Sequence, residues 1–136
     1  MKILSVDLGL ARTGLAISDE LGLLASPLKT IAQGDFSLLL EEIATIAAQE
    51  RAAEIVVGLP RNMDGSCGES AQRAKQFADD LHKKTGLPVH LWDERLTTKS
   101  AIGILNETNV RGKKRKNVVD AVAAVIILED YLRSRQ

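Results

Sequence analysis

Three carboxylates stand where apolar segments of this chain begin or end, and carboxylates in such places are candidate metal ligands. Asp7 ends the first apolar run, Glu94 follows a later one, and Asp120 lies within the apolar segment 118–128. Burying a carboxylate among apolar side chains costs free energy unless it is paired or binds a metal. Oxygen ligands without cysteines or suitably spaced histidines favour Mg²⁺ or Mn²⁺ over zinc. The set predicts phosphodiester hydrolysis, because such ions clamp phosphoryl oxygens.

Each carboxylate also has a structural interpretation. Asp7 precedes a glycine-containing turn that its side chain could brace. Glu94 and Arg95 could form a surface ion pair at the end of a strand. Asp120 lies three residues after Asn117, so it could stabilise the first turn of a helix capped there. Spacing alone leaves both interpretations open for all three residues.

A run of cations stands just before Asp120. Residues 111–116 read Arg-Gly-Lys-Lys-Arg-Lys, and we expect them to form a basic loop. A phosphate backbone attracted to this loop would lie beside Asp120. The formal net charge of the chain is zero, so any surface that binds nucleic acid must be local. The predicted nucleic-acid contacts are Arg12, Arg95, Arg111, Lys113, Lys114, Arg115 and Lys116.

Composition limits the class of protein. The chain has 136 residues, the size of one domain, and is 45% hydrophobic with 3% aromatic residues. Cys67 is the one cysteine of the sequence, which excludes an internal disulfide. No secretory signal is visible, and the longest apolar segment is too short to cross a bilayer. We therefore expect a cytoplasmic protein, either a monomer or a weak homodimer.

The hydrophobic pattern predicts how these residues are positioned. Period-two alternation and short apolar runs predict strands, whereas three-to-four spacing with capping residues predicts helices. Strands are expected at residues 2–7, 13–18, 23–31, 54–59 and 89–92. Helices are expected from Asp35, from a Ser66–Glu69 capping box to Lys84 and Gly86, from residue 97 or 98 to about 106, and over 117–133. The order predicts a single α/β domain over 1–136, with a five-stranded mixed sheet, three antiparallel strands then two parallel, flanked by helices.

Four segments together resemble one known family over nearly all of the chain. They are Val6-Asp7-Leu8-Gly9 with Arg12-Thr13-Gly14, Val57-Gly58-Leu59-Pro60, Asp93-Glu94-Arg95-Leu96-Thr97-Thr98, and Asp120-Ala121-Val122-Ala123-Ala124. Each is weak alone, but the combination is similar to the YqgF (RuvX) family of pre-16S rRNA nucleases and Holliday junction resolvase-like proteins.

The resemblance implies an RNase H-like fold and a nuclease that trims the 5′ end of the 16S rRNA precursor in bacteria. It implies that Asp7, Glu94 and Asp120 are catalytic and hold Mg²⁺ or Mn²⁺. Pre-rRNA, branched DNA and ribosomal particles are the partners it suggests. Related four-carboxylate resolvases have another acid three residues after the helical aspartate, where this chain has Ala123. Asp130 cannot replace it, because ten helical residues span about 15 Å.

Three other functions remain open. A DNA endonuclease of the Holliday junction resolvase type is the alternative nuclease. Asp7-Leu8-Gly9 with Gly14 also looks like the first phosphate loop of actin-like ATPases, but these need two such lobes and this chain has the length of one. A non-catalytic module could bind RNA or ribosomes through residues 111–116 alone.

Overall fold

The computed structural model describes residues 1–59, 68–93 and 112–135, and for residues 112–121 it describes the helical backbone but not the side chains. The expected helix between residues 97 and 106 lies outside these ranges. The described elements, in chain order, are β1 (Lys2–Asp7), β2 (Thr13–Ser18), β3 (Ala25–Ile31), α1 (Phe36–Gln49), β4 (Ala52–Leu59), α2 (Glu69–Thr85), β5 (Val89–Asp93) and α4 (Gly112–Ser134).

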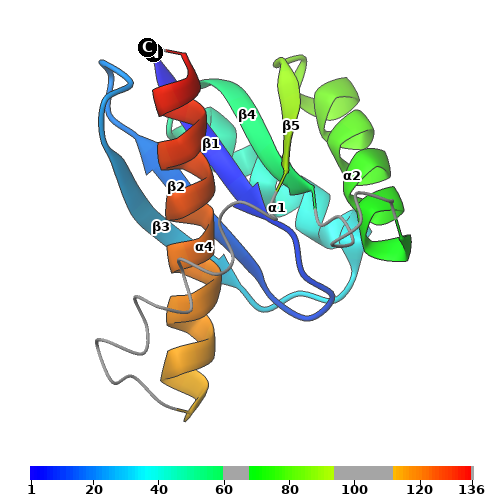
Figure 1. Cartoon of the computed structure of the whole chain (residues 1–136). Coiled ribbons are helices and arrows are strands. Elements are labelled where there is room, and N and C mark those ends of the chain that lie inside the picture. Colours follow the sequence, from blue (N-terminus) through cyan, green and yellow to red (C-terminus); the bar gives the residue numbers. More distant parts are fainter. Residues whose placement is uncertain (60–67, 94–111, 136) are drawn as a thin grey trace.

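The five strands form one mixed sheet in the order β3-β2-β1-β4-β5 (Figure 1). β1, β2 and β3 are antiparallel neighbours, whereas β1, β4 and β5 run parallel. The expected five-stranded mixed sheet is thus confirmed. Since the three parallel strands finish together, we call the end of the sheet marked by Asp7, Leu59 and Asp93 its carboxyl end, and the opposite end its amino end.

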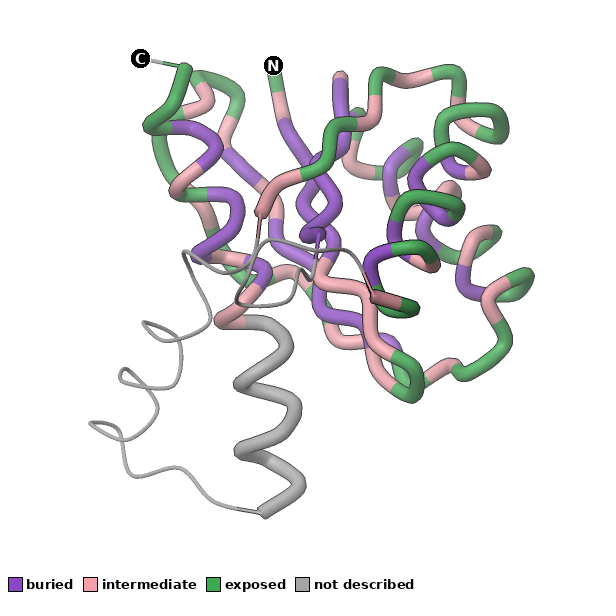
Figure 2. The backbone as a smooth tube through the Cα atoms, turned by 45° about the vertical axis from the view of Figure 1, so that its right-hand side comes forward, coloured by how far each residue is buried: buried purple, intermediate pink, exposed green. Residues whose placement is uncertain are grey.

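Helices cover both faces of the sheet. α1 and α2 pack on one face and α4 crosses the other, so the central strands β2, β1 and β4 are buried between them (Figures 1 and 2). Side chains alternate between the faces along each strand. The α1/α2 face buries Leu4, Val6, Leu15, Ile55 and Val57 with Leu39, Ile43, Phe77 and Leu81. The α4 face buries Ile3, Ala16 and Val56 with Ala124, Ile127, Leu128 and Leu132.

The helix boundaries follow local chemistry. The carboxylate of Asp35 accepts hydrogen bonds from the backbone N–H groups of Ser37 and Leu38, which confirms the expected start of α1. α2 ends at Gly86, whose φ of 74° is left-handed and favours glycine, again as expected. The expected capping box is wrong: α2 starts at Glu69 after Gly68, so Glu69 itself lies in the first turn, where its charge favours the helix dipole.

β3 starts two residues later than predicted because of Asp19. Its carboxylate accepts hydrogen bonds from the backbone N–H groups of Leu23, at 2.8 Å, and Leu24, at 3.1 Å. These bonds lower the pKa of the Asp19 carboxyl. They also occupy donors that a longer strand would offer to its neighbour. Pro27 lies in β3 at the edge of the sheet, the location expected for a strand proline.

Candidate active site

Asp7 is the last residue of β1 and pairs with Gly14 of β2. It is half-buried. Within β1, Val6 lies in the core beneath α1 and α2, whereas Ile3 and Ser5 face α4. The alternation therefore puts Asp7 on the α4 face, at the carboxyl end of the sheet.

The connection after Asp7 is tight because residue 9 is glycine. The Gly9 N–H donates to Thr13 Oγ1 at 3.4 Å, and a Cβ built on Gly9 would overlap the carbonyl oxygen of Arg12. A larger residue would force the loop open. Gly9 thus allows the backbone of Arg12, a predicted nucleic-acid contact, to approach closely just before β2.

The ends of β1 and β5 are level across the sheet. Val6 pairs with Val57 of β4, and Val57 pairs with Leu91 of β5. The next residues, Asp7 and Trp92, are therefore at the same height. β4 lies between them, so the two strands are about 9–10 Å apart.

Two of the predicted site residues near β5 lie outside the described residues. These are Glu94 and Arg95, which follow the last residue of β5, Asp93. Arg111 also lies outside them. The β5 residue that precedes Asp93, Trp92, packs against the buried cluster on the α4 face.

Helix α4 begins earlier than predicted. It starts at Gly112, whereas the sequence predicted a basic loop over residues 111–116 and a helix from Asn117. Lysine and arginine are good helix formers, so the basic run can continue the helix toward its start. Lys113, Lys114, Arg115 and Lys116 thus belong to the first turns of α4.

The early start of α4 bears on Asp120. Asp120 is the ninth residue of a helix that begins at Gly112, so it is beyond the first turn. The interpretation of Asp120 as a first-turn residue after an Asn117 cap is therefore wrong, because free N–H groups and the dipole's positive end occur in the first turn. A reason for an aspartate within an apolar helix must be found elsewhere.

A contact that the sequence did not predict fixes α4 against β1. The Ser5 hydroxyl donates to the backbone carbonyl oxygen of Ala124 at 2.7 Å, and the bond is buried. Nearer the amino end, Met1 and Ile3 border the same cavity as Leu132. α4 therefore runs antiparallel to β1, and its earlier residues lead toward the carboxyl end of the sheet.

Among the residues whose side chains the structure describes, no three histidine, cysteine, aspartate or glutamate residues form a group suited to a metal ion. Glu94 and Asp120 are not among those residues, so the predicted three-carboxylate site is not tested by this result. Within the described part of the chain, no helix is long and apolar enough to span a membrane.

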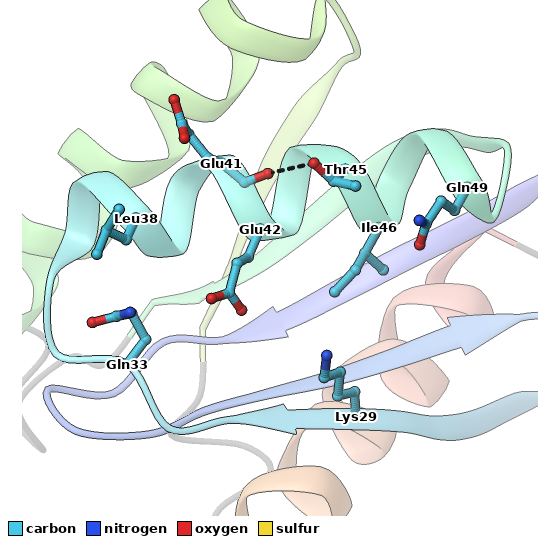
Figure 3. Close-up of a pocket in the computed structure, with 8 residues that line it drawn as sticks. All are labelled: Lys29, Gln33, Leu38, Glu41, Glu42, Thr45, Ile46 and Gln49. Carbon is cyan, nitrogen blue, oxygen red and sulfur yellow. Dashed lines mark hydrogen bonds between the residues drawn. The ribbon is translucent and has the colours of Figure 1, made fainter.

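Two cavities matter for the location of the site. One of about 570 Å³ lies between β3 and α1, and Figure 3 shows it bordered by Lys29, Glu41 and Glu42. None of its lining residues was predicted to be functional, and none belongs to the carboxyl end of β1. A smaller one, of about 120 Å³, is lined by Leu8, Gly9, Leu10, Phe36, Ser70 and Arg73, directly after Asp7 in the chain.

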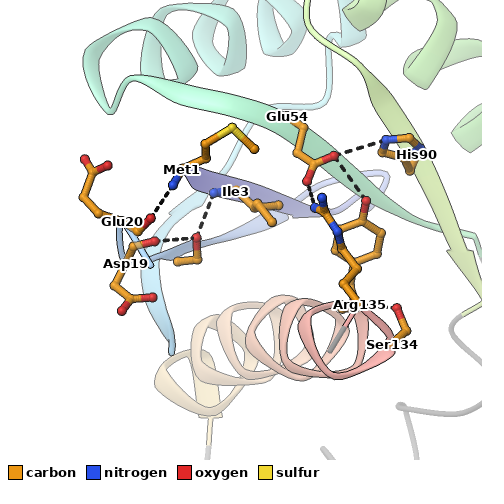
Figure 4. A network of polar contacts seen from close by, with 10 residues as sticks. Met1, Ile3, Asp19, Glu20, Glu54, His90, Ser134 and Arg135 are labelled. Carbon is orange, nitrogen blue, oxygen red and sulfur yellow. Dashed lines mark hydrogen bonds and ion pairs between the residues drawn. The ribbon is translucent and has the colours of Figure 1, made fainter. Parts of the chain in front are cut away.

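The amino end of the sheet holds a partly buried polar network centred on Glu54 (Figure 4). The Glu54 carboxylate accepts hydrogen bonds from the Tyr131 hydroxyl, at 3.2 Å, and from the Arg135 guanidinium, and lies 3.2 Å from His90 Nε2. The sequence analysis assigned no role to Glu54 or His90. The one sequence signal for this network was a charged residue, Glu54, at the start of an apolar strand. This network fastens the last turn of α4 to β4.

Comparison with known protein families places the chain in one of them. The family model described as "RuvX: Holliday junction resolvase" matches residues 1–134. A protein of Lachnospira eligens is 44% identical over 139 residues, covering 100% of this chain and 99% of the relative. One of Halothermothrix orenii is 45% identical, covering 97% of this chain and 94% of the relative. Both are named "Putative pre-16S rRNA nuclease".

Solved structures agree on the fold. RuvC of T. thermophilus, in complex with a Holliday junction substrate, matches with a TM-score of 0.64 at 15% identity, covering 99% of this chain and 95% of RuvC. The fowlpox virus Holliday junction resolvase matches with a TM-score of 0.61 at 12% identity, covering 100% of both chains. The fold is thus RNase H-like, as expected. With a family model matched over 134 residues and full-length relatives above 40% identity, this chain belongs to the RuvX family.

Proposed function

We propose that this protein is a metal-dependent nuclease that hydrolyses phosphodiester bonds in structured nucleic acid and processes the 5′ end of pre-16S rRNA. Membership of the RuvX family and the names of its relatives support the nuclease activity and the RNA substrate. The catalytic residues we propose are Asp7, Glu94 and Asp120, which would together hold Mg²⁺ or Mn²⁺.

This proposal rests mainly on the Ser5–Ala124 hydrogen bond, because that bond sets the position of α4 along the direction of β1. Asp7 lies two residues beyond Ser5, about 6.6 Å along the strand. Asp120 lies four residues before Ala124, about 6 Å along the helix and on the same helical face. Since α4 and β1 are antiparallel, both displacements lead toward the carboxyl end. This argument supports a shared site for the two aspartates.

Strand alternation supports including Glu94 in the proposed site. Trp92 faces α4, and one more strand pair beyond Asp93 would bring Glu94 to the same face. The backbones of β1 and β5 are about 9–10 Å apart at this height, a distance that an aspartate and a longer glutamate can bridge through a common ion. Three carboxylates also fit the preference of Mg²⁺ and Mn²⁺ for oxygen ligands.

The chain's own residues would bind and orient the substrate. A bound ion would supply a water of lowered pKa and charge stabilisation for the leaving oxygen. Arg12, Lys113, Lys114, Arg115 and Lys116, with Arg95 and Arg111, would hold the phosphate backbone so that the scissile bond lies at the carboxyl end. We further propose a cytoplasmic monomer or weak homodimer that acts on pre-rRNA or on ribosomal particles.

A Holliday junction resolvase activity is the second candidate, favoured by the family description and by the two resolvase structures. The structure offers one observation against it. In α4, position 123, where four-carboxylate resolvases have an acid, is alanine. Asp130 lies two turns beyond that position and forms an ion pair with Arg133. A non-catalytic RNA-binding module is the third candidate.

One experiment separates the three candidates. The protein is incubated with a precursor 16S 5′-end RNA hairpin and with a four-way DNA junction, each in Mn²⁺, Mg²⁺ or EDTA. We expect RNA cleavage in either metal and none in EDTA. Symmetric cleavage of the junction alone would favour the resolvase, and tight RNA binding without cleavage in any metal would favour the binding module. Full cleavage in EDTA would overturn metal dependence.

A further inference from the structure

The small cavity beside Asp7 lies on the other face of the sheet from the proposed catalytic carboxylates. Its first lining residue, Leu8, packs against the core beneath α1 and α2, whereas Asp7 faces α4. The neighbouring Cα atoms are about 3.8 Å apart. A nucleic-acid strand that crosses the carboxyl end of the sheet at Asp7 would therefore pass the residues that line this cavity.

The residues that line the cavity are complementary to a phosphate-sugar unit. Arg73 and Ser70 supply polar groups, while Leu10 and Phe36 supply apolar walls. Leu10 is 64% exposed, a large apolar side chain in water at the mouth of the cavity. The cavity has a volume of about 120 Å³.

Arg73 is held in place but keeps donors to offer. One of its terminal nitrogens donates to Ser70 Oγ at 3.0 Å, and the other lies 3.9 Å from the carboxylate of Glu69. The Glu69 side chain is 94% exposed, so this pair is screened and weak. A guanidinium has five N–H donors in a planar fork that matches a phosphate. Arg73 can therefore exchange Glu69 for a phosphate at little cost.

We propose that this cavity binds the phosphate next to the scissile one on the same strand, with Arg73 donating to its oxygens and Leu10 and Phe36 contacting the adjoining sugar. The proposal rests on the nuclease function above, since it extends the path of that substrate. It assigns Arg73 a role in binding the substrate backbone. Arg73 and Arg12 would then offer one cation on each face of the sheet near Asp7.

The first test measures binding without cleavage. The probe is a labelled RNA hairpin with a single-stranded 5′ extension, in EDTA, over a range of KCl concentrations. For Arg73→Ala we expect about tenfold weaker binding and a plot of log affinity against log salt that is flatter by about 0.7–0.9, one phosphate contact. Lys83→Ala is the matched control, because it removes one cation from the far end of the same helix. An Arg73→Ala slope equal to the parent's would overturn the proposal.

The second test uses the exposed leucine. Leu10→Glu puts a negative charge at the cavity mouth without removing a core residue, and we expect it to weaken RNA binding about tenfold. Leu38→Glu makes the same change at an exposed leucine, 50% exposed, on α1. We expect Leu38→Glu to bind as the parent does. Equal effects of the two variants would contradict a phosphate site at the cavity.

The third test locates the phosphate. Neutral methylphosphonate linkages are placed one at a time along the RNA probe, and the affinities of parent and Arg73→Ala are compared as double-mutant cycles. We expect one neutral linkage to weaken RNA binding by the parent but not by Arg73→Ala, and where the parent cleaves the RNA this linkage should lie next to the cleavage site. Additive losses at every linkage would overturn the assignment. Because these measurements use EDTA, they read Arg73 even if the parent proves unable to cleave RNA, which would instead defeat the proposed function.

Discussion

The two faces of the sheet are built from different chemistry. The face beneath α1 and α2 is covered by aliphatic side chains and Phe77, packed without buried charge among the described residues. The face beneath α4 also buries polar groups, with Ser5 against the α4 backbone and Glu54 against Tyr131. The difference indicates that the first face mainly stabilises the fold, whereas the second holds one helix at a defined height.

The polar contacts of the α4 face explain how a single helix can be positioned so closely. Apolar contacts are non-directional, so they permit small shifts along the helix axis. A buried hydroxyl must find an acceptor, and the one it finds is the Ala124 carbonyl. The Glu54 network fixes the other end of α4 through Tyr131 and Arg135. Both contacts lie after Asp120 in the chain, and together they set the position of α4 along the sheet.

The largest effect on stability should come from the α1/α2 face. Ile43→Ala removes a fully buried side chain from α1 and should lower the free energy of unfolding by about 2–5 kcal/mol, the transfer and cavity cost of such a truncation. Urea denaturation measures it. Leu38→Ala, at an exposed position of the same helix, is the control. A loss below about 1 kcal/mol would contradict a tightly packed first face.

A smaller loss should follow removal of the charge at Glu54. Glu54→Gln keeps the shape but leaves Arg135 without its carboxylate, and should cost about 1–3 kcal/mol. The Glu54 side chain is 9% exposed, so little solvent reaches its end of the pair, whereas the Arg135 side chain, 44% exposed, regains some solvent and limits the loss. Glu50→Gln, at a surface pair with Lys2, should cost less than about 0.5 kcal/mol. Equal losses in the two variants would show that α4 is not fastened at this end.

Ser5→Ala should have a modest effect on stability and a clearer one on activity. Losing one buried hydrogen bond costs about 0.5–1.5 kcal/mol in unfolding experiments. Because the bond sets the height of α4, the rate of RNA cleavage at saturating substrate should fall while RNA affinity in EDTA is retained. The control is Ser134→Ala, at the last residue of α4. An unchanged cleavage rate in Ser5→Ala would show that the Ser5–Ala124 hydrogen bond does not position α4 for cleavage.

The smallest effect concerns alkaline pH. Burial raises the pKa of the Tyr131 phenol above its ordinary value. The unfolded chain therefore ionises first, near pH 10, so stability is unaffected below that pH and falls as pH rises toward the folded pKa. Melting temperatures between pH 8 and 11 should fall less steeply for Tyr131→Phe than for the parent. Parallel curves would indicate that packing against the sheet does not desolvate the Tyr131 phenol.

The sequence predicted what local patterns determine. Alternation and caps were enough for the five strands, the start of α1 and the stop at Gly86. The predicted start of α4 was wrong. Asn117 is a common helix-capping residue, but the lysines and arginines before it have good helix propensity, and the helix begins at Gly112.

The contacts that position the site could not be predicted, because they join residues far apart in the chain. Ser5 and Ala124 are separated by 119 positions, and Glu54 and Tyr131 by 77. No periodicity indicates which buried hydroxyl meets which carbonyl. The strand end at Asp7 was predictable because the apolar run stops there beside a glycine turn. The sequence pattern of α2 alone gives Arg73 the character of an ordinary surface residue.

The central claim is that Asp7, Glu94 and Asp120 hold one metal-dependent site. The most direct measurement is the cleavage rate of the precursor RNA in Mn²⁺ for Asp7→Asn, Glu94→Gln and Asp120→Asn, with RNA affinity measured in EDTA and Asp79→Asn, at an exposed position of α2, as control. We predict that each of the three lowers the rate by more than about 100-fold with little change in affinity, while the control cleaves as the parent does. Cleavage at the parent's rate by any of the three would contradict the claim.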